Sequence, residues 1–94
     1  MDAFGATAEL FGALSNPIRL RLVVELLESP HCVHDLTERT GASQSLVSQH
    51  LRVLRQARLV AGRRSGREII YSVSDEHIAH IVRDAIAHIQ EGSS

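Results

Sequence analysis

The sequence predicts a mostly α-helical domain with one small β-hairpin, and three observations lead to this prediction. Apolar residues recur at the spacing of an amphipathic helix in several separate segments. Two of those segments are joined by a short turn that contains Gly41. The pattern then changes to a period of two, with β-branched and aromatic residues after a turn. With 94 residues, the chain suits a single domain spanning residues 1–94.

The first part of the chain is expected to form three helices. A first helix is expected over residues 6–14, and Asn16-Pro17 then starts a second one that runs to about residue 28. Asparagine caps helices and proline fits the first helical turn, so this pair marks a helix start. Ser29-Pro30 ends the second helix, and a short third helix is expected over residues 32–39.

Gly41 suits the left-handed position just after the third helix, and Ser43 or Ser45 can cap a fourth helix that runs to about residue 57. Helix, short turn and helix form the helix-turn-helix outline. Two short strands are expected next, over residues 59–61 and 69–73, joined by a basic turn. A basic hairpin directly after a helix-turn-helix is a wing, so the predicted architecture is a winged helix-turn-helix.

The last helix has the clearest pattern. Its apolar residues recur at i, i+3, i+4, i+7, i+8 and i+11, namely Ile78, Ile81, Val82, Ala85, Ile86 and Ile89. Asp75 is placed to cap this helix, and the polar residues 91–94 are placed to end it.

Composition is ordinary for a soluble globular protein, with 44% hydrophobic and 22% charged residues. No apolar run approaches the roughly 20 residues that a membrane span needs, and no basic-then-apolar signal opens the chain. We therefore expect a cytoplasmic protein without a membrane partner. Cys32 is the one cysteine, which excludes an internal disulfide framework.

The positive charge is concentrated although the formal net charge is −1. All ten basic residues are arginine, and six of them fall within sixteen consecutive positions, 52–67. Such a basic patch on a near-neutral protein is typical of a nucleic-acid-binding face. Charge alone leaves a simple solvated surface as an equal alternative.

The fourth helix provides a second indication of DNA binding. Its polar face carries amides, hydroxyls, a histidine and an arginine, and a helix fits the major groove. Residues in the first turns are expected to meet base edges, and arginines further on and in the wing are expected to meet phosphates or the minor groove. The predicted DNA-binding residues are Gln44, Ser45, Ser48, Gln49, His50, Arg52, Arg63, Arg64 and Arg67.

Four segments resemble the ArsR/SmtB family of metal-sensing repressors. They are residues 16–20 (NPIRL), 32–36 (CVHDL), 45–51 (SLVSQHL) and 64–71 (RSGREIIY), and the resemblance covers about residues 10–91. It implies a homodimer built from the first and last helices, with double-stranded operator DNA as partner. It also implies repression in the metal-free state and release from DNA when a metal binds.

The last helix carries donors that suit a metal. Helical geometry places His77 and His88 within about 20° around the axis, but eleven residues separate them by roughly 16 Å along it. One chain therefore cannot bring both to one ion. An antiparallel pair of these helices would set Asp75 and His77 of one chain against His88 and Glu91 of the other, forming two symmetric sites.

Two histidines and two carboxylates make a tetrahedral set that suits zinc, with cobalt as a surrogate. The resemblance supports the same four positions, because the spacing of Asp75, His77, His88 and Glu91 matches the family's inter-subunit zinc site. His80 is an additional candidate, and a higher coordination number would favour nickel. The alternative is that these groups only cap and solubilise the helix.

A weaker second candidate site consists of Cys32, His34 and Asp35. The resemblance places soft-metal thiolates on this helix in some members, but His34 stands where a second cysteine is needed, and residues 1–10 hold no Cys or His. We therefore expect Cys32 to be a small buried apolar residue, and His31 and His34 to lie at the surface.

Two alternative functions remain open. One is a winged-helix repressor that responds to a thiol oxidant at Cys32, to another metal or to a protein partner. The other is a metal-buffering protein that binds no DNA. An enzyme is not expected, because no nucleophile–base set, phosphate loop or catalytic carboxylate pair occurs at a useful spacing.

Overall fold

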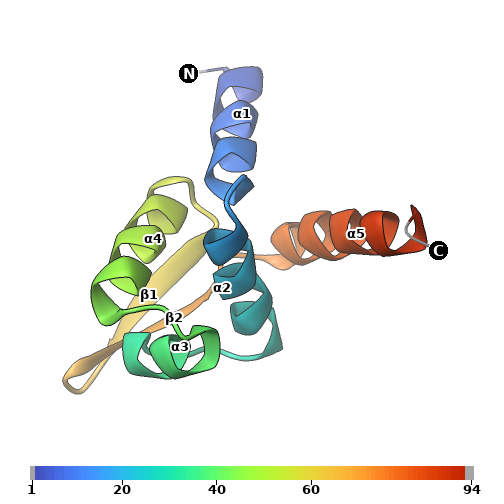
Figure 1. Cartoon of the computed structure of the whole chain (residues 1–94). Coiled ribbons are helices and arrows are strands. Elements are labelled where there is room, and N and C mark those ends of the chain that lie inside the picture. Colours follow the sequence, from blue (N-terminus) through green and yellow to red (C-terminus); the bar gives the residue numbers. More distant parts are fainter. Residues whose placement is uncertain (1, 93–94) are drawn as a thin grey trace.

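The computed structural model describes residues 2–92 as five helices and one two-stranded antiparallel hairpin (Figure 1). The elements are α1 (Ala3–Leu14), α2 (Pro17–Glu28), α3 (Val33–Thr40), α4 (Gln44–Gln56), β1 (Val60–Ser65), β2 (Glu68–Val73) and α5 (Glu76–Gly92). The predicted class, mostly α with a small hairpin, is confirmed. Ser93 and Ser94, which were predicted to follow the last helix, lie outside the described residues.

Side-chain caps fix the start of every described helix except α3, whose N-cap Cys32 makes no side-chain hydrogen bond. The Asn16 carboxamide oxygen accepts from the N–H groups of Ile18 and Arg19, at 2.9 and 3.0 Å. Ser43, rather than Ser45, caps α4 by accepting from the Leu46 N–H at 3.2 Å. The Asp75 carboxylate accepts from the His77 N–H at 2.9 Å. Each cap satisfies N–H groups that a helix start leaves without a partner.

The first helix begins three residues earlier than predicted. The Asp2 carboxylate accepts from the Gly5 N–H at 2.7 Å, so Asp2 is the cap of α1. The missed signal was an aspartate at the capping position.

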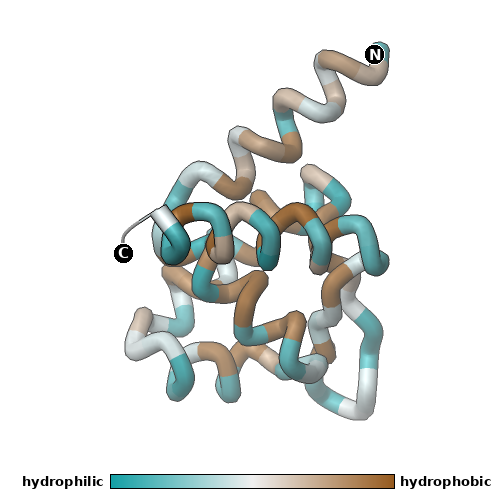
Figure 2. Tube along the Cα trace, turned by 90° about the vertical axis from the view of Figure 1, so that its right-hand side faces the viewer, coloured by the Kyte–Doolittle hydropathy of each residue, from teal (hydrophilic) through white to brown (hydrophobic). Residues whose placement is uncertain are grey.

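The core lies around α2, which contacts every other helix and β2. Its fully buried side chains come from α2, α3, α4, the residue before β1, and α5, namely Leu22, Val23, Leu36, Val47, Leu51, Leu54, Leu59 and Val82. In contrast, α1 and the C-terminal part of α5 extend away from this body (Figure 1), and the projection of α1 is also seen in Figure 2. Both carry exposed apolar side chains, with Phe4 at 89% and Ile89 at 67% exposure.

The hairpin is longer than predicted. Residues 62–65, expected in a turn, continue β1, and the register pairs Val60 with Val73 and Ser65 with Glu68. Only Gly66 and Arg67 remain as the turn, and Gly66 has a φ of 64°. A two-residue turn with positive φ at its first position matches the right-handed twist of paired strands, so pairing extends up to the turn.

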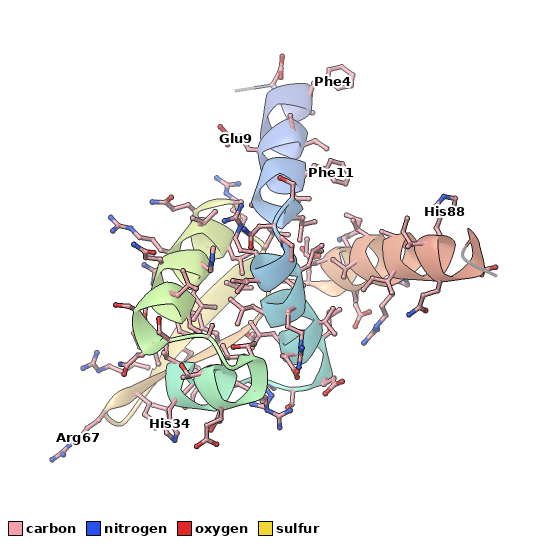
Figure 3. All side chains as sticks on the ribbon, in the orientation of Figure 1. Phe4, Glu9, Phe11, His34, Arg67 and His88 are labelled. Atoms are coloured by element: carbon pink, nitrogen blue, oxygen red, sulfur yellow. The ribbon has the colours of Figure 1, made fainter. Side chains whose placement is uncertain are left out.

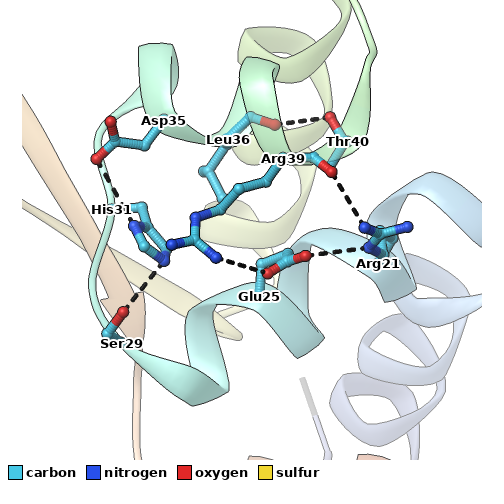
Figure 4. A network of polar contacts seen from close by, with 8 residues as sticks. All are labelled: Arg21, Glu25, Ser29, His31, Asp35, Leu36, Arg39 and Thr40. Atoms are coloured by element: carbon cyan, nitrogen blue, oxygen red, sulfur yellow. Dashed lines mark hydrogen bonds and ion pairs between the residues drawn. The ribbon is translucent and has the colours of Figure 1, made fainter.

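His31 is buried, at 7% exposure, which corrects the expectation of a surface residue. Its backbone N–H donates to the Tyr71 carbonyl at 3.1 Å, and the Tyr71 N–H donates to the His31 carbonyl at 2.8 Å. Its ring nitrogens lie 3.1 Å from the Ser29 hydroxyl and 3.6 Å from the Asp35 carboxylate (Figure 4). The segment before α3 thus adds one rung to the sheet beside β2.

None of the helices in the described part of the chain is long and apolar enough to cross a bilayer.

Candidate nucleic-acid interface and metal-ligating residues

One face of α4 brings together five of the predicted DNA-binding residues. Gln44, Ser45, Ser48, Gln49 and Arg52 are all exposed and line one open depression of about 490 Å³. The opposite face is buried through Val47, Leu51 and Leu54. Because the apolar face is anchored in the core, the polar face is held outward as a rigid row of amides, hydroxyls and one guanidinium, the groups that read bases and hold phosphates.

His50 lies apart from that row. It is half-buried, and its Nδ1 lies 3.2 Å from Nη1 of Arg19 on α2. A guanidinium only donates, so Nδ1 accepts and the ring proton resides on Nε2. Burial lowers the pKa of His50 below its ordinary value of 6.5, and the charge of Arg19 lowers this pKa further. The predicted contact of His50 with DNA stays a prediction.

The hairpin presents the other predicted arginines. Arg63 and Arg64 are exposed neighbours on β1 and therefore point to opposite faces of the hairpin. Arg67 occupies the turn and points away from the body (Figure 3). The hairpin thus places cations on both sides and at its tip, an arrangement suited to phosphates or to a narrow minor groove.

A buried carboxylate positions the helix-turn-helix. Glu25 of α2 lies 3.2 Å from Nε of Arg21 and 3.4 Å from Nη1 of Arg39 on α3 (Figure 4). Arg21 also donates to the Arg39 carbonyl at 3.0 Å. This clamp fixes the end of α3, and Gly41, with a φ of 76°, then makes the turn into α4. Sequence reasoning missed Glu25, although an acid inside the apolar stripe of α2 was its signal.

The predicted metal ligands are all exposed: Asp75 immediately precedes α5, and His77, His88 and Glu91 lie on it, as does the exposed His80. Asp75 Oδ1 lies 3.3 Å from Nδ1 of His77, while His88 is near the far end of the helix (Figure 3). Within residues 2–92, no group of three or more His, Cys, Asp or Glu residues is arranged to hold a metal. The roughly 16 Å of helix between His77 and His88 allows no common ion within one chain, and the site between two chains stays a prediction.

The second candidate set is not brought together. Cys32 is buried, as expected. His34 pairs outward with Glu38 at 3.1 Å, whereas Asp35 turns toward His31. The three donors thus have different environments and different partners, which gives a soft metal no converging thiolate site.

Five helices with a basic hairpin after a helix-turn-helix, together with an outward polar recognition helix, define a winged helix-turn-helix DNA-binding regulator. Comparison with known proteins agrees with this class. Residues 16–61 match the model of the bacterial regulatory protein family arsR, and the chain belongs to this family.

Two curated relatives and one solved structure illustrate the similarity. The HTH-type transcriptional repressor SmtB of Mycobacterium tuberculosis is 50% identical over 90 residues, which cover 96% of this chain and 67% of the relative. The HTH-type transcriptional regulator NmtR of the same species is 44% identical over 87 residues, covering 93% and 72%. A homodimeric winged helix-turn-helix DNA-binding domain from Mycobacterium bovis superposes with a TM-score of 0.88 at 25% identity, covering 94% and 82%.

Proposed function

We propose that this protein is a homodimeric transcriptional repressor that leaves its operator when a divalent metal, zinc first of all, binds between the subunits. The observation that carries the proposal is the row of exposed donors on α5, Asp75, His77, His88 and Glu91, in a chain 50% identical to a repressor named SmtB. No other described element offers two histidines and two carboxylates on one exposed helix.

The donor chemistry suits zinc. His77 and His88 supply imidazole nitrogens and Asp75 and Glu91 supply carboxylate oxygens, and Asp75 Oδ1 lies 3.3 Å from Nδ1 of His77, so the two donors of this half-site are already neighbours. His77 and His88 are roughly 16 Å apart along the helix axis, so each site needs a second copy of α5 running antiparallel to the first. The proposed sites are therefore two, each with Asp75 and His77 from one protomer and His88 and Glu91 from its partner.

Exposed apolar side chains support the dimer. Phe4 and Phe11 on α1 are 89% and 53% exposed, and Ile89 on α5 is 67% exposed. Both helices extend from the body, so their apolar faces are available to a second copy (Figure 3). Burial of such faces is favourable at about 25 cal/mol per Å² of apolar surface. The proposed dimer uses α1 and α5, and it brings the α5 donors together.

Two copies of α4 in one dimer fit successive major grooves of a palindromic operator, with the hairpins on flanking phosphates. Zinc bound between the α5 helices stabilises a dimer geometry in which the two recognition helices no longer match that spacing. The coupling is reciprocal, so operator DNA weakens zinc binding by the same factor.

The test is a fluorescence anisotropy titration of the protein onto its own upstream DNA, first in chelator and then with zinc, nickel and cobalt. Tight binding in chelator that is lost with one metal supports the proposal and identifies the ion. His88→Gln should keep the chelator affinity and lose metal-induced release. His34→Gln, a change of an exposed histidine outside α5, is the matched control and should respond as the wild type does.

Three outcomes would contradict parts of the proposal. Release of the His88→Gln variant by zinc would overturn the site. Tight binding that no metal affects would leave a repressor with another signal. No binding of DNA at any salt concentration would leave a metal-buffering protein.

A further inference from the structure

Arg58 has a backbone conformation that this chain otherwise assigns to glycine. Its φ is 63°, and among the described residues it is the one non-glycine with a positive φ. The other two positive values belong to Gly41, at 76°, and Gly66, at 64°. A side chain in this region crowds the backbone, so Arg58 is a strained residue at a position that suits glycine.

The hydrogen bonds after α4 explain why this conformation is required. The Leu59 N–H donates to the Leu54 carbonyl at 2.9 Å, and the Arg58 N–H donates to the Arg55 carbonyl at 3.0 Å. Leu54 and Leu59 are both fully buried. These two bonds form the Schellman motif. Its left-handed residue, which is Arg58 here, is usually glycine. Burial of Leu54 and Leu59 in the core holds this turn in place, and the turn requires a positive φ at Arg58.

The Arg58 side chain makes no polar contact that would stabilise the described part of the fold. It is exposed, and within residues 2–92 it forms neither an ion pair nor a side-chain hydrogen bond. It lines an open cleft of about 340 Å³ with Glu9 and Gln56, but no ion pair joins Arg58 to Glu9. The guanidinium is therefore available to a ligand outside the chain.

The surrounding charge indicates the ligand. Arg52, Arg55 and Arg58 follow one another at three-residue intervals, and all three are exposed. Around the α4 axis, Arg55 lies within about 20° of both Gln44 and Ser48, so it continues the predicted DNA face. From Gln44 to Arg55 that face is roughly 16 Å long, and Arg58 extends the row of cations past the end of the helix.

We propose that Arg58, with Arg55 beside it, binds backbone phosphate at the C-terminal end of α4, outside the contacts of the first turns and of the hairpin. The proposal rests on the proposed DNA binding and adds to it a phosphate contact on each half-site. A guanidinium binds phosphate through two parallel N–H donors, and that contact offsets the backbone strain when DNA is bound.

Arg58→Gly separates the two effects of this residue. It removes the backbone strain, so Tm is expected to rise by a few degrees. It also removes one phosphate contact per protomer, so the slope of log K against log salt is expected to become shallower by about 1.8 per dimer. The affinity advantage of the wild type over the variant should then grow about twelve-fold between about 200 and 50 mM salt.

Two matched variants complete the test, and all are measured in chelator on the same upstream DNA. Arg58→Lys keeps both the strain and the charge and should keep the wild-type salt slope. Arg83→Gln removes the same charge from α5, far from α4, and should leave the slope unchanged (Figure 1). A more stable Arg58→Gly variant with the wild-type slope overturns the phosphate contact while the DNA-binding proposal stands. Failure of the wild type to bind DNA overturns both.

Discussion

Nη1 of Arg19 lies 3.2 Å from Nδ1 of His50, so a guanidinium of α2 contacts the recognition helix from its inner side. The Nε of the same arginine donates to the Ala13 carbonyl at 2.6 Å, at the end of α1. One side chain therefore joins α1, α2 and α4. The helix α1 is proposed to contact the second protomer. A change in its packing can therefore reach α4 directly, through the polar contacts of Arg19.

This relationship predicts a pH dependence of stability. The pKa of His50 is lowered in the folded state by burial and by Arg19. The unfolded chain therefore binds more protons than the folded one between the folded pKa and about 6.5. The contribution of His50 is fully present above about pH 6.5 and is lost as the pH falls toward the folded pKa. Thermal unfolding at about pH 7.5 and 5.5 measures this loss.

His50→Gln should show a smaller loss of stability between those two pH values than the wild type, because it has no group to protonate there. His34→Gln is the control, since His34 lies on the exposed face of α3 and pairs with Glu38. An equal pH dependence in the wild type and the His50→Gln variant would contradict the assignment.

The clamp at Glu25 predicts a stability effect at the helix-turn-helix. Glu25→Gln keeps the shape of the side chain but removes the charge that Arg21 and Arg39 share. Because both arginines are about half exposed, we expect a loss of about 1–2 kcal/mol in the free energy of unfolding. Urea unfolding measures it. Glu28→Gln, an exposed acid at the end of the same helix, should change stability by less than about 0.5 kcal/mol.

Two glycines predict opposite responses to alanine. A Cβ on Gly62 would lie 2.9 Å from Cγ2 of Ile69 and 3.3 Å from Cε1 of Tyr71, so these side chains or the strands that carry them must shift. We expect Gly62→Ala to lower stability by about 1–3 kcal/mol. A Cβ on Gly12, within α1, meets nothing within 4 Å. Gly12→Ala should raise stability by about 0.5–1 kcal/mol. Urea unfolding of both variants at one protein concentration measures these changes. If the two variants changed the free energy of unfolding in the same direction, the packing described would be contradicted.

The exposed His80 predicts a difference between metals. It lies one helical turn after His77, close enough for a coordination shell larger than four. His80→Gln should therefore weaken nickel binding more than zinc binding, because zinc is satisfied by four ligands whereas nickel takes more. Competition against a chromophoric chelator gives both affinities. Equal losses for the two metals would exclude His80 as a nickel-specific ligand.

Elements set by local patterns could be predicted from the sequence. The order of helices and strands followed from the apolar periodicity, and Asn16 and Asp75 from the rules of capping. The polar face of α4 was predictable because its apolar face is regular and fixes the orientation of the rest.

Features that depend on contacts between distant segments could not be predicted. The length of β1 depends on pairing with β2, and the burial of His31 depends on the strand rung it shares with Tyr71. His50 was predicted with the DNA-binding residues, but the helical period places it about 100° beyond Gln49, where Arg19, 31 residues away in the chain, contacts it. The metal site, in contrast, was predicted from helical spacing and the family resemblance, and it stays a prediction because half of its proposed ligands belong to a second chain.

The β-bridge between His31 and Tyr71 also determines where the hairpin tolerates substitutions. It fastens the hairpin to the body at one end, where Tyr71 and Val73 pack against the core. The other end, at Gly66 and Arg67, is exposed. Substitutions at the tip therefore leave the core unaffected, so the proposed DNA contacts of the tip can change while the packing that determines folding stays the same.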